Sequence, residues 1–195
     1  AQVGTGANVM IAGFVVGEGA PKRVLVRAVG PALAAFSVTG TLTDPVLELY
    51  DGKGALLTTN DNWTAADAAA MAGVGAFPLT AGSRDAALVA TLAPGAYTAQ
   101  VSGAVGTTGV ALLEVYEVTG PARLINLSTR ATVGTGSNTL IAGLVIAPGA
   151  GSRRLLVRAA GPALAAFALT GANSDPALEI LDGGGRPIAS NDNWS

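Results

Sequence analysis

Short apolar runs alternate with turn sequences along the whole chain, a pattern typical of antiparallel β-sheets. Val, Leu and Ile dominate the runs, and glycine or proline stands in the turns between them, as in Gly17-Glu18-Gly19 and Ala93-Pro94-Gly95. The pattern predicts strands at 8–16, 22–29, 46–50, 55–59, 85–91, 95–102 and 109–118. Strands of this length and spacing predict an antiparallel β-sandwich.

The polar and apolar positions also predict which faces of the strands are buried. Tyr97, Ala99 and Val101 alternate with polar residues, so we expect these three side chains to share one face of a strand. Val24-Leu25-Val26 is instead apolar on both faces. Such a strand needs cover on both sides, and we expect a neighbouring domain or subunit to cover the face opposite the sandwich core.

Two segments interrupt the strand pattern. The sequence Gly30-Pro31-Ala32-Leu33-Ala34-Ala35-Phe36 has Pro31 at a first helical position, and it recurs at 161–167 with Pro162 in the equivalent place. We predict a single helical turn in both places, with the two prolines in packing roles. Residues 64–72 are rich in alanine, with Thr64 as a cap and Asp67 at the third helical position, which predicts a short surface helix.

The first part of the sequence occurs twice. Val3-Gly4-Thr5-Gly6 recurs as Val133-Gly134-Thr135-Gly136, and Asn60-Asp61-Asn62-Trp63 recurs as Asn191-Asp192-Asn193-Trp194. A period of about 130 residues is that of a whole small domain, which indicates tandem domains rather than a solenoid. The predicted strands at 8–16 and 22–29 recur at 138–146 and 153–160, whereas the sequence from 64 to 120 occurs once.

The repeat predicts the domain organisation. We expect residues 1–120 to form a first β-sandwich repeat, and 121–130 to form a short stiff connector that is also the first strand of the next repeat. Residues 131–195 then form the N-terminal half of a second, incomplete repeat. Half a sandwich has unpaired edges and an uncovered apolar face, which are unfavourable in water. We expect either that the remaining strands lie in sequence beyond these residues or that another chain supplies them by strand addition.

The composition argues against several classes of function. The chain is 50% hydrophobic and only 12% charged, and its net charge of -2 gives no electrostatic footprint for nucleic acid. Cys and His are absent, which removes disulfides, thiolate catalysis and the usual zinc sites, so we expect no enzymatic activity. No apolar stretch is long enough to span a membrane. The chain begins without Met or a signal-like segment, so we expect a mature or excised piece.

Three segments carry a resemblance to a known family. They are Asp44-Pro45-Val46-Leu47-Glu48-Leu49-Tyr50-Asp51-Gly52-Lys53-Gly54, the Asn60-Asp61-Asn62 loop, and residues 87–101 with Leu92, Gly95, Tyr97 and Val101. Together they resemble the bacterial pre-peptidase C-terminal (PPC) domain family, which runs from a D-x-x-L-x-L-Y-D-x-x-G strand pair to an L-x-x-G-x-Y-x-x-x-V strand. The similarity covers 41–118, and the chain departs from the family pattern at 64–83.

The block before residue 41 resembles repeats of large secreted bacterial surface proteins. Together these resemblances imply an extracellular, all-β fold of tandem sandwiches, jelly-roll-like or immunoglobulin-like, that serves as an accessory or structural module. Some members of the PPC family bind calcium in acidic loops, and Asp51, Asn60, Asp61 and Asn62 offer the hard oxygen ligands that Ca²⁺ prefers.

The same asparagine and aspartate residues have a second interpretation. Asn and Asp stabilise turns through hydrogen bonds from their own side chains to the backbone, so a structural turn and a calcium site both stay open. We expect Trp63 and its equivalent Trp194 to anchor the loops on the sandwich, and we expect no other cofactor. Glu48 with Arg27, repeated as Glu179 with Arg158, predicts a cross-strand or surface ion pair.

These expectations combine into a functional hypothesis. The chain is expected to be a non-enzymatic structural protein of the bacterial cell surface, secreted and assembled head to tail into a fibre, sheath or adhesin stalk. Its expected partner is itself, as a homopolymer or as neighbouring repeats, with complementation of strands or half-domains between subunits. The alternative is an accessory carbohydrate- or calcium-binding module of a secreted enzyme or adhesin. Aromatic residues make up only 5% of the chain, which argues against a glycan-binding platform.

Overall fold

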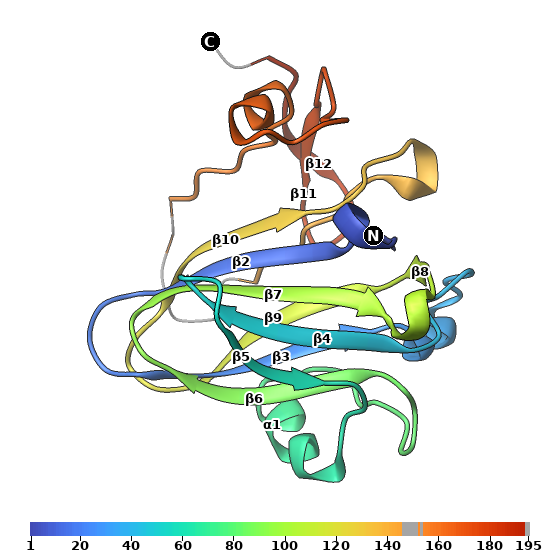
Figure 1. Cartoon of the computed structure of the whole chain (residues 1–195). Coiled ribbons are helices and arrows are strands. Elements are labelled where there is room, and N and C mark those ends of the chain that lie inside the picture. The colour runs from blue at the N-terminus through green and yellow to red at the C-terminus, as the bar shows by residue number, and fades with distance from the viewer. Residues whose placement is uncertain (146–151, 153, 194–195) are drawn as a thin grey trace. The chain divides into compact units, whose positions relative to one another are not determined.

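The computed structural model describes residues 1–145, 152 and 154–193, and the chain divides into two compact units (Figure 1). Unit 1 is Ala1–Ala142 and contains the first repeat and the start of the second. Unit 2 is Gly143–Ser195 and contains the rest of the second repeat.

Unit 1 is an all-β sandwich of two antiparallel sheets, as the strand pattern predicts. The larger sheet has the order β10-β2-β7-β4-β5, and the smaller sheet has the order β6-β3-β9. The strands of the larger sheet are Leu124–Arg130 (β10), Met10–Val16 (β2), Gly95–Gly103 (β7), Pro45–Asp51 (β4) and Leu56–Asn60 (β5). Those of the smaller sheet are Ala86–Leu92 (β6), Lys22–Val29 (β3) and Leu112–Thr119 (β9), and a further pair joins β1 (Gln2–Val3) to β8 (Gly109–Val110).

The main core of unit 1 draws on both sheets. Alternate residues of β2, β3, β4 and β7 are buried in it, because side chains of a strand point to opposite faces in turn. The cluster includes Val24 and Val26 of β3, Leu47 and Leu49 of β4, and Ala99 and Val101 of β7. Tyr97 stacks on Phe14 with 5.7 Å between the ring centroids. The predicted inward face of β7 is therefore confirmed.

A second core cluster covers the other face of the smaller sheet. Leu25 and Val29 of β3 are buried there against Met71 and Leu79 of the segment 64–83. This segment contains a 3₁₀ turn, η3 (Ala65–Asp67), and the helix α1 (Ala68–Gly73), with a capping box of Thr64 as predicted (Figure 1). The expectation that a neighbouring domain or subunit covers this face is wrong, because the chain's own alanine-rich segment covers it.

The segment between the repeats forms the edge strand β10 of the larger sheet. β10 pairs antiparallel with β2, from Leu124 opposite Val16 to Arg130 opposite Ile11. Beyond the strand, Thr132 forms a further antiparallel bridge with Gln2. The segment expected to connect the repeats and to begin the second one therefore lies in the sheet of the first.

Two local predictions differ from the structure in detail. The predicted strand at 109–118 is divided into β8 and β9 by Ala111, whose N–H donates to the carbonyl of Ala1 at 3.0 Å. The helical turn at 30–36 is the 3₁₀ helix η2 (Pro31–Phe36), and Ser37 after it has a left-handed φ of 61°. Further 3₁₀ turns are η1 (Gly6–Asn8), η4 (Ala104–Gly106) and η5 (Gly136–Asn138).

Unit 2 contains a β-hairpin and a 3₁₀ helix. β11 (Leu178–Leu181) pairs with β12 (Pro187–Asn191), and η6 (Pro162–Phe167) repeats the turn η2. The strands predicted at 138–146 and 153–160 do not form in residues 138–145 and 154–160, so that prediction is wrong for the described part of both ranges. In the first repeat, β2 and β3 are held by ladders to β7, β6 and β9, and the sequence has no second copy of those three strands.

Candidate functional site

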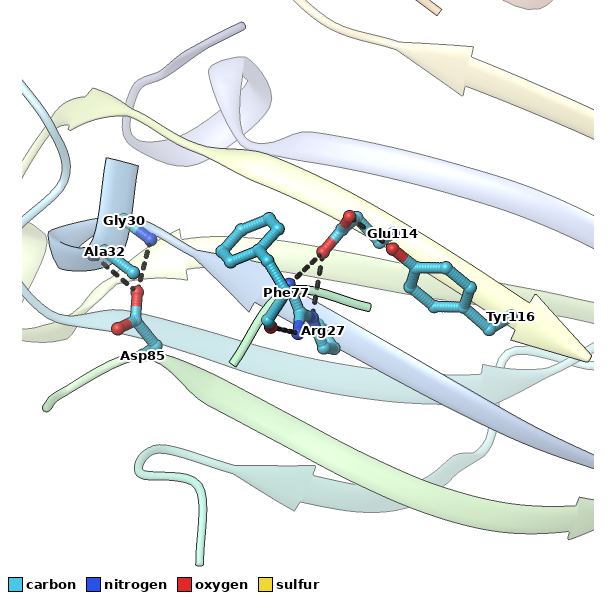
Figure 2. A network of polar contacts seen from close by, with 7 residues as sticks. All are labelled: Arg27, Gly30, Ala32, Phe77, Asp85, Glu114 and Tyr116. Atoms are coloured by element: carbon cyan, nitrogen blue, oxygen red, sulfur yellow. Dashed lines mark hydrogen bonds and ion pairs between the residues drawn. The ribbon is translucent and has the colours of Figure 1, made fainter. Parts of the chain in front are cut away.

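A buried arginine joins the smaller sheet to its covering segment (Figure 2). Arg27 of β3 is fully buried, its Nε donates to Glu114 Oε2 at 2.8 Å, and its Nη2 lies 2.7 Å from the same oxygen. Glu114 stands directly opposite on β9. Arg27 Nη1 donates to the carbonyl of Phe77 at 2.6 Å, and the guanidinium lies 4.4 Å from the centre of the Phe77 ring. Arg27 therefore fastens the segment 64–83 onto the sheet.

The expected ion pair between Arg27 and Glu48 is wrong. Glu48 lies on β4 of the larger sheet, in line with Gln100 of β7, whereas Arg27 lies on β3 of the smaller sheet. The corresponding residues of the second repeat, Arg158 and Glu179, are both exposed. The carboxylate that pairs with Arg27 thus comes from the part of the repeat that occurs only once in the sequence.

Glu114 also accepts a hydrogen bond from Tyr116. The phenol oxygen of Tyr116 donates to Glu114 Oε1 at 2.6 Å. Burial raises the pKa of Tyr116 to about 12, helped by the hydrogen bond to Glu114 and by its negative charge. The phenol therefore stays protonated and remains a donor at neutral pH, which makes the group of Arg27, Glu114 and Tyr116 a structural network.

Asp85 holds the turn at which η2 begins (Figure 2). Its Oδ1 accepts hydrogen bonds from the N–H groups of Gly30 at 2.8 Å and Ala32 at 3.2 Å, and its Oδ2 accepts one from Ser83 at 2.7 Å. A Cβ on Gly30 would lie 2.1 Å from the carbonyl oxygen of Leu42. The turn therefore requires glycine and a carboxylate from the once-present part of the repeat.

The loop after β5 is anchored on the smaller sheet and its cover. Asn60 Oδ1 accepts from the N–H of Ala87 at 2.9 Å. The indole Nε1 of Trp63 donates to Ser83 Oγ at 3.1 Å, and the side chain of Trp63 packs against the second core cluster. These contacts place Trp63 in a packing role.

Asp51 closes the turn between β4 and β5. Its Oδ1 accepts from the N–H of Lys53 at 2.8 Å and of Ala55 at 2.9 Å. The hydrogen bonds from Ala55 and Lys53 hold the pKa of the exposed Asp51 carboxyl below its usual value. This geometry is that of a turn stabilised by its own aspartate.

The four candidate calcium ligands are not brought together. Asn60 stands opposite Leu47, at one end of the β4–β5 hairpin, whereas Asp51 lies beside the turn at the other end. Asp61 and Asn62 follow Asn60 in the chain and therefore lie at the same end of the hairpin as Asn60. Within the described residues, no group of three or more Asp, Glu, His or Cys side chains is placed to hold a metal ion.

The other predicted packing residues lie in several places. Pro31 and Pro162 each begin a 3₁₀ helix, η2 and η6. Tyr97 Oη donates to the carbonyl of Ala93 at 2.9 Å. Trp194 lies outside the described residues.

The second repeat exposes the apolar residues that the first repeat buries. Leu155, Leu156 and Val157 are 52%, 85% and 39% exposed, and their counterparts at 24–26 are fully buried. Leu144 is 58% exposed, and its counterpart Phe14 is 1% exposed. Burial of one such side chain contributes about 1.5–3 kcal/mol, so together these residues have a strong tendency to be covered. We take this surface of unit 2, residues 143–145 and 154–160, as the candidate functional site and call it the open half-repeat.

A groove of about 260 Å³ lies within unit 2 along the open half-repeat. Leu155, Leu156, Val157, Leu178 and Ile180 line it, together with Ala189, Ser190 and Asn191 of β12. The lining is mostly apolar, with Ser190 and Asn191 as its polar members, so it is suited mainly to apolar side chains.

Both edges of the larger sheet in unit 1 are also apolar. β10 and β5 are the outermost strands. Ile125 and Leu127 of β10 are 70% and 53% exposed, and Leu56 and Leu57 of β5 are 52% and 47% exposed. Exposed apolar edge strands without charges or proline along their middle are templates for pairing with another chain.

The part of the chain that the structure describes holds no helix long and apolar enough to cross a membrane. Comparisons with models of protein families, with curated proteins and with solved structures found no match to this chain.

Proposed function

We propose that the chain is a non-enzymatic structural repeat protein whose β-sandwiches follow one another head to tail in an extracellular fibre, sheath or adhesin stalk. The partner in this proposal is another subunit or a neighbouring repeat, which completes the open half-repeat. A secreted location at the bacterial cell surface belongs to the same proposal and rests on the resemblance to PPC-like repeats of secreted surface proteins.

The exposure of Leu155, Leu156 and Val157 is the observation that carries the proposal. Identical or similar residues are fully buried in the first repeat, so the sequence of the second repeat is suited to a covered position. The apolar edge strands β5 and β10 add a second surface that favours association between sandwiches. An interface with different surfaces on the two partners generates an open filament when its rotation does not close into a ring.

Light scattering after size-exclusion chromatography, with electron microscopy of the same fractions, tests the proposal. We expect the mass of the purified chain to rise with concentration from the low micromolar range, and we expect elongated particles. A mass that stays that of one chain at every concentration, with no elongated particles, contradicts the proposal.

A pair of matched variants shows which surface is used. Leu156→Asp places a charge on the open half-repeat and is expected to lower the mass of the assembly. Ala166→Asp is the control, because Ala166 and its counterpart Ala35 in the complete first repeat are both exposed. Equal effects of the two substitutions argue against the open half-repeat as the contact.

A further inference from the structure

The first repeat shows which strands cover the residues equivalent to the open half-repeat. β7 pairs with the whole length of β2, from Met10 opposite Val101 to Val16 opposite Gly95. β6 and β9 pair with the two sides of β3, so that Leu25 stands between Val89 and Tyr116. By this equivalence, a strand like β7 would pair with 143–145, and strands like β6 and β9 would flank 154–160.

The groove of unit 2 has a matching occupant in the first repeat. Its lining residues Leu155, Val157, Leu178 and Ile180 correspond in sequence to residues 24, 26, 47 and 49. Those four residues share one core cluster with Leu88 of β6 and with Ala99 and Val101 of β7. Small and branched apolar side chains at the spacing of β6 and β7 are therefore suited to the groove.

Charge adds a specific requirement to this apolar surface. Arg158 is exposed, and its counterpart Arg27 is fully buried and pairs with Glu114 of β9. Covering Arg158 with apolar strands alone would leave a buried charge without a partner, which costs several kcal/mol. A partner must therefore bring a carboxylate to the place that Glu114 takes.

The turn before η6 also needs a carboxylate from the partner, as an acceptor for its backbone N–H groups. The N–H groups of Gly30 and Ala32 are bonded to Asp85 in the first repeat. Gly161 repeats the close backbone approach of Gly30, because a Cβ there would lie 1.9 Å from the carbonyl oxygen of Asn173. The turn of the second repeat is thus already formed and lacks only the acceptor.

We propose that the open half-repeat is a docking surface for a polypeptide with the strand pattern of residues 65–120, and that Arg158 selects this partner through a glutamate equivalent to Glu114. The inference rests on the proposed function and names the partner of its open surface. Residues 65–120 of a second copy already complete that copy's own first repeat, so the surface is met either by exchange of this segment between copies or by a further segment of the same pattern.

The test extends the full chain at its C-terminus with a second copy of residues 65–120 and measures amide hydrogen exchange. We expect exchange at 155–157 to slow by at least about a hundredfold relative to the unextended chain, as in a stably paired strand. Exchange at 24–26, measured in the same sample, reports whether the first repeat is folded. Unchanged exchange at 155–157 in a chain whose first repeat is protected overturns the proposal.

One further sample separates recognition from simple apolar covering. The extended chain then carries Glu114→Gln in the appended segment only, and we expect it to lose most of the added protection at 155–157. Full protection in this variant overturns the role of Arg158.

The test for fibres uses the unextended chain, so the two outcomes are independent. Protection at 155–157 in the extended chain, with no elongated particles from the unextended chain, upholds the docking surface and contradicts the fibre. Elongated particles from the unextended chain, with no protection at 155–157 in the extended chain, uphold the fibre and contradict this partner.

Discussion

At the scale of single residues, two buried polar side chains hold the irregular parts of the sandwich. Arg27 fastens the covering segment to β3, and Asp85 caps the turn before η2. Both were visible in the sequence as charged residues, but their partners were not, because Glu114 and Phe77 lie far from Arg27 along the chain. The sequence pattern instead suggested Glu48, which the fold places in the other sheet.

Arg27→Gln is expected to destabilise unit 1 by about 2–3 kcal/mol, because Glu114, whose side chain is only 15% exposed, would be left without its cation. Equilibrium unfolding in urea measures the change. Arg23→Gln on the same strand is the control, since Arg23 is exposed and its loss is expected to change stability by less than about 0.5 kcal/mol. Equal effects of the two substitutions would show that the network contributes little.

Gly30→Ala is expected to destabilise unit 1 by about 1–3 kcal/mol, because the new methyl group would meet the carbonyl oxygen of Leu42 at 2.1 Å. The obstacle is backbone, so it cannot rotate away as a flexible side chain would. Gly73→Ala is the matched control, because nothing lies within 4 Å of a Cβ at that position. The melting temperatures of both variants are compared with that of the parent. A Gly30→Ala variant as stable as the parent contradicts the close approach of Gly30 to the carbonyl of Leu42.

At the scale of elements, alternation of polar and apolar residues predicted most strands of the first repeat correctly. The prediction failed where a strand forms only when neighbouring strands pair with it. Residues 140–145 and 154–160 have nearly the sequence of β2 and β3, yet they remain unpaired in the described structure because a strand is stabilised by its neighbours. The cover by 64–83 was missed for a similar reason, since its short helix is almost all alanine and shows no alternation of polar and apolar residues to mark the face on which it packs.

Glu117 ties β9 to both its neighbour in the sheet and the following strand. Its carboxylate lies 2.8 Å from Lys22 Nζ and accepts from the N–H of Leu124 at 2.7 Å. Burial alone raises the pKa of Glu117, but the hydrogen bonds from Lys22 and Leu124 and the charges of Lys22 and Arg123 outweigh it and hold the pKa below its usual value. The carboxylate thus stabilises the fold only while it is ionised.

A depressed pKa in the folded state gives stability that is present above the unfolded pKa and lost as pH falls through the folded one. We expect the free energy of unfolding to fall between about pH 5 and pH 3, and Glu117→Gln to remove less than about 1 kcal/mol of that fall, since its side chain is 37% exposed. Urea unfolding at both pH values measures this. Glu18→Gln, in an exposed turn, controls for net charge, and an equal pH response in both variants contradicts the role of Glu117.

At the scale of the whole molecule, the two copies of the repeated sequence differ in burial, since residues 24–26 are buried and residues 155–157 are exposed. The internal repeat was plain in the sequence, and so was the single occurrence of residues 64–120. The expected boundary after residue 120 could not anticipate that β10 pairs with β2, since the apolar pattern of 124–130 suits any free sheet edge.

Hydrogen exchange of the unmodified chain at low concentration is expected to distinguish the repeats. Amides at 24–26 should exchange slowly, through global unfolding of unit 1, and amides at 155–157 should exchange at nearly the rate of an unfolded chain. Mass spectrometry after proteolysis resolves the two segments. Similar protection of both in a monomeric sample contradicts the exposure of the second repeat.

The bridge between Gln2 and Thr132 bears on how a repeat responds to mechanical load. The two residues are neighbours at the end of the sheet where Arg130 stands opposite Ile11. A pulling force applied between residues 1 and 131 therefore enters the β10–β2 ladder from one end. When an antiparallel ladder is loaded from one end, its hydrogen bonds break one after another rather than all together in shear. Under tension, β10 would peel away before the core yields, and it would lengthen the repeat while the two sheets stay packed.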